Sequence, residues 1–334
     1  MKKIFYFILI SIFSLTVISC AEKDEVSSSN DDSSSGTSSS SGTSSSSVSF
    51  VAVGDSGTLL TSPDAITWTS RTSGTSNNLR SFAFDGSSTG VVVGYSGTIL
   101  TSTDGITWTS RTSGTSKNIN NVAYGNSKFI AVGDNGTTLY SSDGITWTDW
   151  TSSCGANDNE SLWDVAYGSS TWVVVGNNGS IYTSDESSCT KRTSGTTVEF
   201  YELIYGDSTF VAAGDNGTVL TSGNGTTWTS RTSGTTNNLY GGVYTASNPV
   251  GAKEFVLVGA SGKIIASSDG ASWQTVSPAS VTTGSIFGIA RGSTTWVVVG
   301  SSGYISSISD SEDDLTTRDS GTTESLKRVF HVSN

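Results

Sequence analysis

The sequence predicts an all-β protein: a seven-bladed β-propeller with four-stranded antiparallel blades, whose ring is closed by the C-terminal strand. Three observations lead to this prediction. An apolar run ends in glycine seven times, and a second glycine follows each time after three residues. The runs recur about every 40 residues. They are short and show no 3.6-residue helical pattern. The first glycines of the pairs are Gly54, Gly94, Gly133, Gly176, Gly214, Gly259 and Gly300.

The third copy shows how one blade is expected to form. NVAYG (121–125) is a short strand rich in small and β-branched residues. FIAVG (129–133) is apolar throughout, as expected for a strand covered on both faces. DNG (134–136) predicts a hairpin turn, because Asn and Gly tolerate positive φ. TTLYS (137–141) alternates and predicts the third strand, and ITWTDW (145–150) predicts the fourth.

A turn motif of the form S-x-D-G-x-T-W precedes the fourth strand in several copies. It resembles the Asp-box of neuraminidase-type repeats, one residue shorter. We expect its aspartate to accept backbone hydrogen bonds within the turn and its tryptophan to fill the space between blades. Asn224 can form the same turn, which indicates a structural role rather than acid catalysis. The motif residues are Asp64 and Trp68, Asp104 and Trp108, Asp143 and Trp147, Asn224 and Trp228, and Asp269 and Trp273.

The two ends of the repeat array are expected to meet. The first copy begins at VSFVAVG (48–54) and lacks an inner strand of its own. Val329 follows Leu315 by 14 residues, the interval between outer and inner strands in other copies. We therefore expect the segment from Val329 to Val332 to pair with the first blade and remove two exposed edges. The single histidine, His331, lies in this segment and is expected to be structural.

The first 19 residues resemble a bacterial lipoprotein signal peptide. Two lysines precede an apolar stretch too short to span a bilayer comfortably. The stretch ends in VISC, which resembles a lipobox and implies that Cys20 carries the lipid. Each buried methylene of an acyl chain contributes about 0.8 kcal/mol, so lipidated Cys20 would hold the protein firmly on a membrane.

The next segment predicts a tether. Residues 20–47 comprise the lipidated cysteine and a serine-rich linker with no aromatic residue, so nothing offsets the entropy of ordering it. Residues 48–334 form the propeller. We expect an exported, lipid-anchored lipoprotein of the bacterial cell envelope, facing the periplasm or the cell surface.

The largest aromatic departure from the repeat follows the third blade, where the connection to the next inner strand is four residues longer. In propellers this connection lies on the face of the turns between second and third strands, which commonly binds partners. We hypothesise a contact surface there; the alternative is that its two tryptophans pack beneath the loop. The proposed surface consists of Trp150, Asn157, Asp158, Glu160 and Trp163.

Two cysteines belong to the same neighbourhood. Cys189 occupies the position where most blades have the motif tryptophan, and Cys154 lies in the lengthened connection. In an exported chain a disulfide between them would persist. It would replace the missing packing between blades, with a typical stabilisation of about 2–4 kcal/mol.

Composition and motifs argue against several functions. A net charge of −12 without a basic patch is unfavourable for nucleic-acid binding. One histidine excludes HExxH and most zinc sites, and the GDNG turn has too few ligands for calcium. No metal, cofactor or catalytic residue is predicted, and we expect no enzymatic activity. Arginines recur in RTSGT or RDSGT on the outermost strand, at Arg71, Arg111, Arg192, Arg231 and Arg318.

Residues 48–334 as a whole resemble the photosystem II stability/assembly-factor-like propellers, in copies such as VAVGDSGTLL and TSTDGITWTSRTSGT. The resemblance implies a non-catalytic, membrane-anchored, monomeric scaffold that presents one face to a protein partner. The family's basic interaction patch does not carry over, because these arginines lie on the outer strand. A carbohydrate-binding, lectin-like propeller with sugar platforms at Trp150 and Trp163 is the alternative. A neuraminidase-like glycoside hydrolase ranks third.

Overall fold

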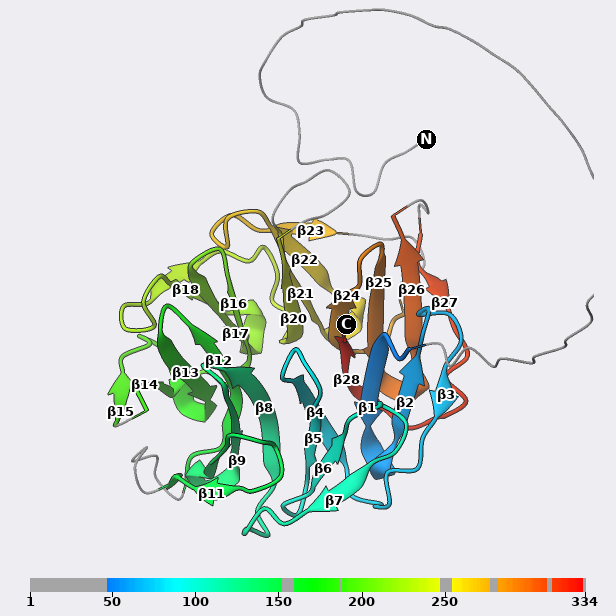
Figure 1. Cartoon of the computed structure of the whole chain (residues 1–334). Coiled ribbons are helices and arrows are strands. Elements are labelled where there is room, and N and C mark those ends of the chain that lie inside the picture. The colour runs from blue at the N-terminus through cyan, green and yellow to red at the C-terminus, as the bar shows by residue number, and fades with distance from the viewer. Residues whose placement is uncertain are drawn as a thin grey trace, which may run out of the picture.

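The computed structural model describes residues 47–151, 159–186, 188–246, 254–276, 282–310 and 314–332. Their strands form seven antiparallel sheets of four strands each, arranged in a ring (Figure 1). The seven-bladed propeller is therefore confirmed. None of the helical turns in these residues has the length and hydrophobicity needed to cross a bilayer.

In each blade the first strand named is the innermost, at the hub, and the last is the outermost. Blade one has β28 (Leu326–His331), β1 (Phe50–Gly54), β2 (Leu59–Ser62) and β3 (Thr69–Ser70). Blade two has β4 (Leu79–Phe84), β5 (Gly90–Gly94), β6 (Ile99–Ser102) and β7 (Thr109–Arg111). Blade three has β8 (Ile119–Gly125), β9 (Lys128–Gly133), β10 (Thr138–Ser141) and β11 (Thr148–Asp149). Blade four has β12 (Leu162–Gly168), β13 (Thr171–Gly176), β14 (Ile181–Ser184) and β15 (Cys189–Arg192).

The other three blades repeat this order. Blade five has β16 (Phe200–Gly206), β17 (Thr209–Gly214), β18 (Val219–Ser222) and β19 (Thr229–Arg231). Blade six has β20 (Leu239–Thr245), β21 (Glu254–Gly259), β22 (Ile264–Ser267) and β23 (Gln274–Val276). Blade seven has β24 (Ile286–Arg291), β25 (Thr295–Gly300), β26 (Ile305–Ser309) and β27 (Thr316–Thr317). Single 3-10 turns join second and third strands at η1 (Asp55–Gly57), η2 (Asp134–Gly136), η3 (Asn177–Gly179), η4 (Asp215–Gly217), η5 (Ala260–Gly262) and η6 (Ser301–Gly303).

The paired glycines of the repeat allow close approaches of the backbone. A Cβ atom on Gly54 would lie 2.3 Å from the carbonyl oxygen of Ser325, just before the innermost strand. On Gly57 it would lie 1.9 Å from the carbonyl oxygen of Thr75, and Gly57 also has a φ of 72°. A side chain at either position would clash with backbone, and at Gly57 it would also have to adopt a left-handed conformation. The repeated glycine pair is therefore a requirement of the fold.

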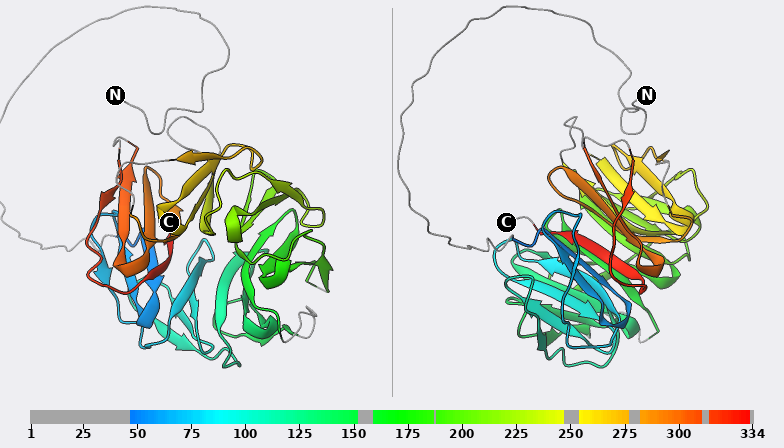
Figure 2. Two further views of the ribbon diagram at one scale, coloured as in Figure 1. Left: turned by 180° about the vertical axis from the view of Figure 1, so that it is seen from behind. Right: turned by 90° about the vertical axis from the view of Figure 1, so that its right-hand side faces the viewer.

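The ring closes as predicted. Strand β28 pairs antiparallel with β1, with Phe50 opposite His331 and Ala52 opposite Val329. The Val332 amide adds a further bond to the Ser49 carbonyl oxygen at 2.8 Å. Figure 2 shows the red C-terminal strand beside the blue strands of blade one. The His331 ring packs 5.0 Å from the Phe50 ring, and burial together with nearby Arg291 lowers its pKa. These contacts fit a structural role.

The turn motif uses its polar side chains to hold the turn. Oδ1 of Asp143 accepts hydrogen bonds from the amides of Ile145 and Thr146, both at 2.8 Å. These residues are thereby taken out of the predicted fourth strand, which shortens to Thr148–Asp149. Asn224 accepts the equivalent two bonds at 2.9 and 3.0 Å, which confirms that asparagine forms the same turn as aspartate there.

The motif tryptophans pack between neighbouring blades, as expected. Trp68 joins a buried cluster of residues from blades one and seven, and Trp108 joins one from blades one and two. Blades four and seven have Cys189 and Leu315 at this position instead. In these two blades the second strand carries a tryptophan, Trp172 or Trp296, where blades one, three, five and six have phenylalanine. Each tryptophan packs toward the preceding blade and supplies the packing that the outer position lacks.

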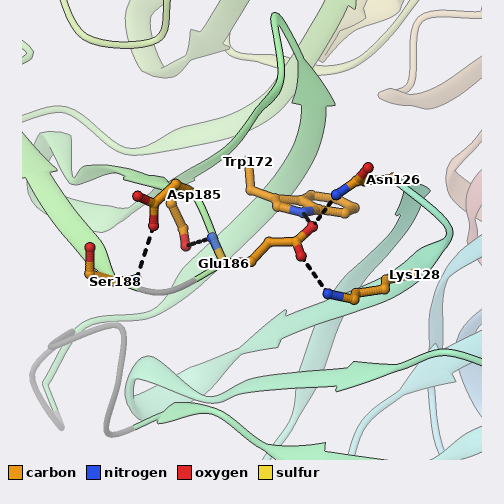
Figure 3. Close-up of polar contacts among 7 residues, drawn as sticks. Asn126, Lys128, Trp172, Asp185, Glu186 and Ser188 are labelled. Carbon is orange, nitrogen blue, oxygen red and sulfur yellow. Dashed lines mark hydrogen bonds and ion pairs between the residues drawn. The ribbon is translucent and has the colours of Figure 1, made fainter.

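The junction of blades three and four has a further connection (Figure 3). The shortened turn of blade four places Glu186 beside the first hairpin of blade three. Its carboxylate accepts hydrogen bonds from the Trp172 indole at 3.3 Å and the Asn126 amide at 2.6 Å, and pairs with Lys128. Trp172 and Glu186 thus connect the two blades without the motif tryptophan.

The recurring arginines lie at the outermost strands, as predicted. The Nε atom of Arg111 donates to Oγ1 of Thr101 on the third strand at 2.8 Å. The same contact recurs in Arg71 with Thr61, Arg192 with Thr183, Arg231 with Thr221, and Arg318 with Ser307. Each arginine therefore fastens the outer edge of its own blade.

Candidate binding site at the hub

Every inner strand carries a β-bulge near its start. In blade four the register shifts between Leu162 and Asp164, which leaves Trp163 without a partner residue. The same shift occurs in all seven blades, and a bulge redirects the side chain of the extra residue. We call these seven residues the hub ring. From blade one to blade seven they are Lys327, Arg80, Asn120, Trp163, Tyr201, Tyr240 and Phe287.

Four consecutive members of the hub ring are aromatic. The ring centroids of Trp163 and Tyr201 lie 6.1 Å apart, those of Tyr201 and Tyr240 5.4 Å, and those of Tyr240 and Phe287 5.5 Å. All four side chains are half-buried. They form a continuous aromatic arc over blades four to seven, on the face of the 3-10 turns, where half-exposed rings offer contact area at low entropic cost.

The rest of the hub ring is polar. Nζ of Lys327 lies 2.8 Å from Oδ2 of Asp55 and 4.8 Å from the Phe287 ring centroid. The Arg80 guanidinium stacks 5.4 Å from the Tyr95 ring. The Asn120 amide donates to Oδ1 of Asp134 at 2.9 Å and is buried. The hub ring therefore has an aromatic half and a polar half, and the polar half contains two basic residues, Lys327 and Arg80.

Two carboxylates border the aromatic arc. The Tyr201 hydroxyl lies 2.9 Å from Oε2 of Glu199 and 3.0 Å from Oδ1 of Asp215. Burial and these two carboxylates raise the pKa of Tyr201, so its hydroxyl keeps its proton. One proton serves one carboxylate at a time. Within the described residues neither acid takes part in an ion pair.

A charged triad lies one residue further along the inner strands. Nη2 of Arg328 lies 3.4 Å from Oδ2 of Asp164, and Nη1 bonds to Glu202. The arginine side chain is 15% exposed and the two acids 6% and 5%. This hub triad connects the closing strand of blade one with blades four and five. Burial raises the pKa of Glu202 against the opposing effect of Arg328, and the neighbouring Asp164 raises it further.

Sequence reasoning identified Trp163 but missed the rest of the hub ring and the triad. A signal was present: the position after the first apolar residue of each inner strand reads K, R, N, W, Y, Y, F across the blades. The residue type at this position differs between blades, whereas a repeat is recognised by the positions that stay the same.

The structure places the other predicted contact residues differently. Trp150 is half-buried and packs edge-on against Tyr140 at 6.3 Å, within the interface of blades three and four. Glu160 is 7% exposed and accepts hydrogen bonds from Ser180 and Tyr182. Its burial argues against a role in an exposed contact surface.

Several predictions fall outside the described residues. These are Asn157 and Asp158 of the contact surface, Cys154 of the disulfide, and the lipidated Cys20. Cys189 lies on β15 and is half-buried. Its pairing with Cys154 therefore stays a prediction.

A cavity of about 220 Å³ lies between blades one and two, away from the hub ring. Aromatic residues Phe82, Phe84 and Trp108 line it. It forms where Gly90 stands on the second strand in place of an aromatic residue. Within the described residues, no three His, Cys, Asp or Glu side chains are arranged to hold a metal ion.

Fold and hub together define a seven-bladed β-propeller. No protein-family model and no curated protein sequence matches the chain. Among solved structures it is similar to YCF48 bound to D1 peptide, with a TM-score of 0.53 and 20% identity over 75% of this chain and 82% of that one. YCF48 from Cyanidioschyzon merolae gives 0.53 and 16%, over 74% and 84%. The WD40 propeller domain of Doa1 gives 0.57 and 15%, over 76% and 87%. At these identities the likeness shows the fold alone.

Proposed function

We propose that this protein is a non-catalytic binding or assembly scaffold that presents the hub face to a protein partner. The observation that carries the proposal is the aromatic arc of Trp163, Tyr201, Tyr240 and Phe287, half-exposed on the face of the 3-10 turns. Aromatic residues are enriched in the cores of protein interfaces. In YCF48, a protein of the same fold, a peptide is bound.

Membrane attachment is part of the proposal. A lipid on Cys20 and the serine-rich linker would hold the propeller near a bilayer while leaving its faces accessible. In cells expressing Cys20→Ser, we expect the protein to lose its lipid, seen as the absence of incorporated labelled palmitate. Equal labelling of the variant and the natural chain would contradict the anchor.

Carbohydrate binding is the second candidate, because stacked aromatic rings also serve as platforms for sugars. Trp163 belongs to the arc, whereas Trp150 packs on Tyr140 and is less suited to a platform. Glycan arrays probed with the natural chain and Tyr240→Ala would test this candidate. Glycan binding that Tyr240→Ala abolishes would favour a lectin.

Glycoside hydrolysis ranks third. Two buried acids with raised pKa lie at the hub, and such groups can act in acid catalysis. Here both pair with Arg328, and Asp164 also accepts the backbone amide of Leu203 at 2.8 Å. This pairing supports a structural role. Turnover of a fluorogenic sialoside, lost in Glu202→Gln, would favour the enzyme instead.

The decisive experiment is photo-crosslinking in intact cells. Benzoyl-phenylalanine replaces Tyr240 on the hub ring or, as a control, Ile106 in an exposed turn of blade two, where the side chain is 42% exposed. We expect a discrete protein adduct from position 240 alone, identified by mass spectrometry. Adducts at equal yield from both positions, or none from position 240, would contradict binding at the hub face.

A further inference from the structure

The chemistry around the aromatic arc indicates what part of a partner it would hold. This inference rests on the proposed function and goes beyond it. The arc offers partly exposed aromatic rings at Trp163 and Tyr201, and the bordering acids Glu199 and Asp215 both approach the Tyr201 hydroxyl. Aromatic faces attract cations, and carboxylates form charge-assisted hydrogen bonds with guanidinium and ammonium groups.

The balance of charge at this part of the hub is negative. The Tyr201 hydroxyl can satisfy one carboxylate at a time, and no cation of the described chain pairs with either acid. The whole chain carries a net charge of −12, which attracts positively charged partners at longer range. A cationic group from a partner would therefore neutralise the negative charge of Glu199 and Asp215.

The opposite half of the hub ring determines how a bound segment would be oriented. Lys327 is already paired with Asp55, and Arg80 is stacked on Tyr95, in blades one and two. Because Asp55 compensates Lys327, the charge that would repel a basic side chain is that of Arg80, which takes part in no ion pair within the described residues. A bound segment would thus turn its basic side chain toward blades four and five.

We propose that the hub ring binds an extended segment of a partner protein through an arginine or lysine side chain, seated against Trp163 and Tyr201 and neutralised by Glu199 and Asp215. The aromatic rings of Tyr240 and Phe287 take the adjoining apolar part of the segment. Charge complementarity thus selects a basic segment over an acidic or neutral one.

The test uses the mature chain, solubilised in detergent, and three capped peptides. Their sequence is Gly-Leu-X-Leu-Gly, with arginine, its neutral isostere citrulline, or glutamate at X. Fluorine NMR of fluorotryptophan-labelled protein, with the Trp163 signal assigned from Trp163→Phe, follows binding. We expect the arginine peptide to shift that signal and to bind about five- to tenfold more tightly than the citrulline peptide at low salt. The difference should shrink as salt is added.

Matched variants separate the local charge from the net charge. Glu199→Gln and Asp215→Asn should each weaken the arginine peptide about two- to fivefold. Asp319→Asn makes the same charge change on the exposed connection into blade one and should have no effect. Thermal unfolding of each variant checks that the fold is unchanged.

Each other outcome is also informative. Equal binding of the arginine and citrulline peptides, or tighter binding of the glutamate peptide, overturns the cationic guest but leaves segment binding at the hub in place. An effect of Asp319→Asn equal to those of the hub variants also overturns it, because only net charge would then matter. No binding by any peptide overturns the inference, whereas crosslinking from position 240 still decides the proposed function.

Discussion

Arg328 is expected to be the most sensitive charged residue of the fold. Arg328→Met keeps a long apolar side chain but leaves Asp164 and Glu202 buried without a counter-ion, at 6% and 5% exposure. Removing one partner of a buried ion pair costs about 3–5 kcal/mol, and both carboxylates lose their partner here. We therefore expect the free energy of unfolding at neutral pH to fall by about that amount, as measured by urea denaturation.

The pH dependence gives a second readout. Burial already raises the pKa of both acids above the ordinary carboxyl values, and losing Arg328 removes the interaction that opposes this rise. A carboxyl whose folded-state pKa is raised contributes stability below its unfolded pKa, which is lost as the pH rises through the folded pKa. The loss in free energy of unfolding caused by Arg328→Met should therefore be smaller at about pH 5 and larger toward pH 8.

Two controls make this reasoning refutable. Arg111→Met removes an arginine of an outer strand that bonds to Thr101 on the third strand, and it should cost about 1 kcal/mol. Adding Asp164→Asn and Glu202→Gln to Arg328→Met should restore most of the loss, because no buried charge then remains. A loss no larger than that of Arg111→Met, or one that grows on acidification, would refute the account of the triad.

Three further predictions concern the joints of the ring. A small cavity of about 30 Å³ lies beside Leu315. Leu315→Phe should fill it and raise the free energy of unfolding, measured by urea denaturation, by about 0.5–1 kcal/mol. Leu315→Ala should lower that free energy by about 2–5 kcal/mol. A destabilised Leu315→Phe would show that the cavity cannot accept the ring. Asn224→Asp should leave the midpoint of urea unfolding almost unchanged. Asn224→Ala removes the acceptor of two backbone hydrogen bonds and should lower the free energy of unfolding by about 1–2 kcal/mol. Equal effects of the two substitutions would contradict the role of the side-chain oxygen. Intact-mass analysis should show a disulfide between Cys154 and Cys189. Its reduction should lower the free energy of unfolding by about 2–4 kcal/mol. A mass that does not change on reduction would contradict the pairing.

Much of the fold could be predicted because its determinants are local and repeated. The glycine pair, the turn motif and the apolar second strand each act within a few residues, and the copies reinforce one another. Ring closure was also predictable, since the first blade visibly lacks an inner strand and the final segment has the spacing to supply it. The role of Trp172 was missed because compensation by another strand cannot be seen in one motif.

The candidate site was only partly predictable for the same physical reason. Trp163 was identified because it follows an unusual insertion, at the start of β12, but Glu160 at the end of that insertion is buried. Whether a side chain near a loop is exposed depends on neighbours that the loop sequence does not contain. Tyr182 and Lys191, which bond to Glu160, come from the third and fourth strands of blade four, β14 and β15.

By itself the sequence determined the number of blades, the turns and the closing strand, because each depends on contacts between residues close together or on a count of repeats. Only the tertiary structure decided what lies at the hub. Arg328 meets Glu202 across 126 positions and Asp164 across 164. The aromatic arc likewise takes one residue from each of four blades. Such groups come together only because the ring brings every inner strand to one axis, and no local pattern in the chain encodes that meeting.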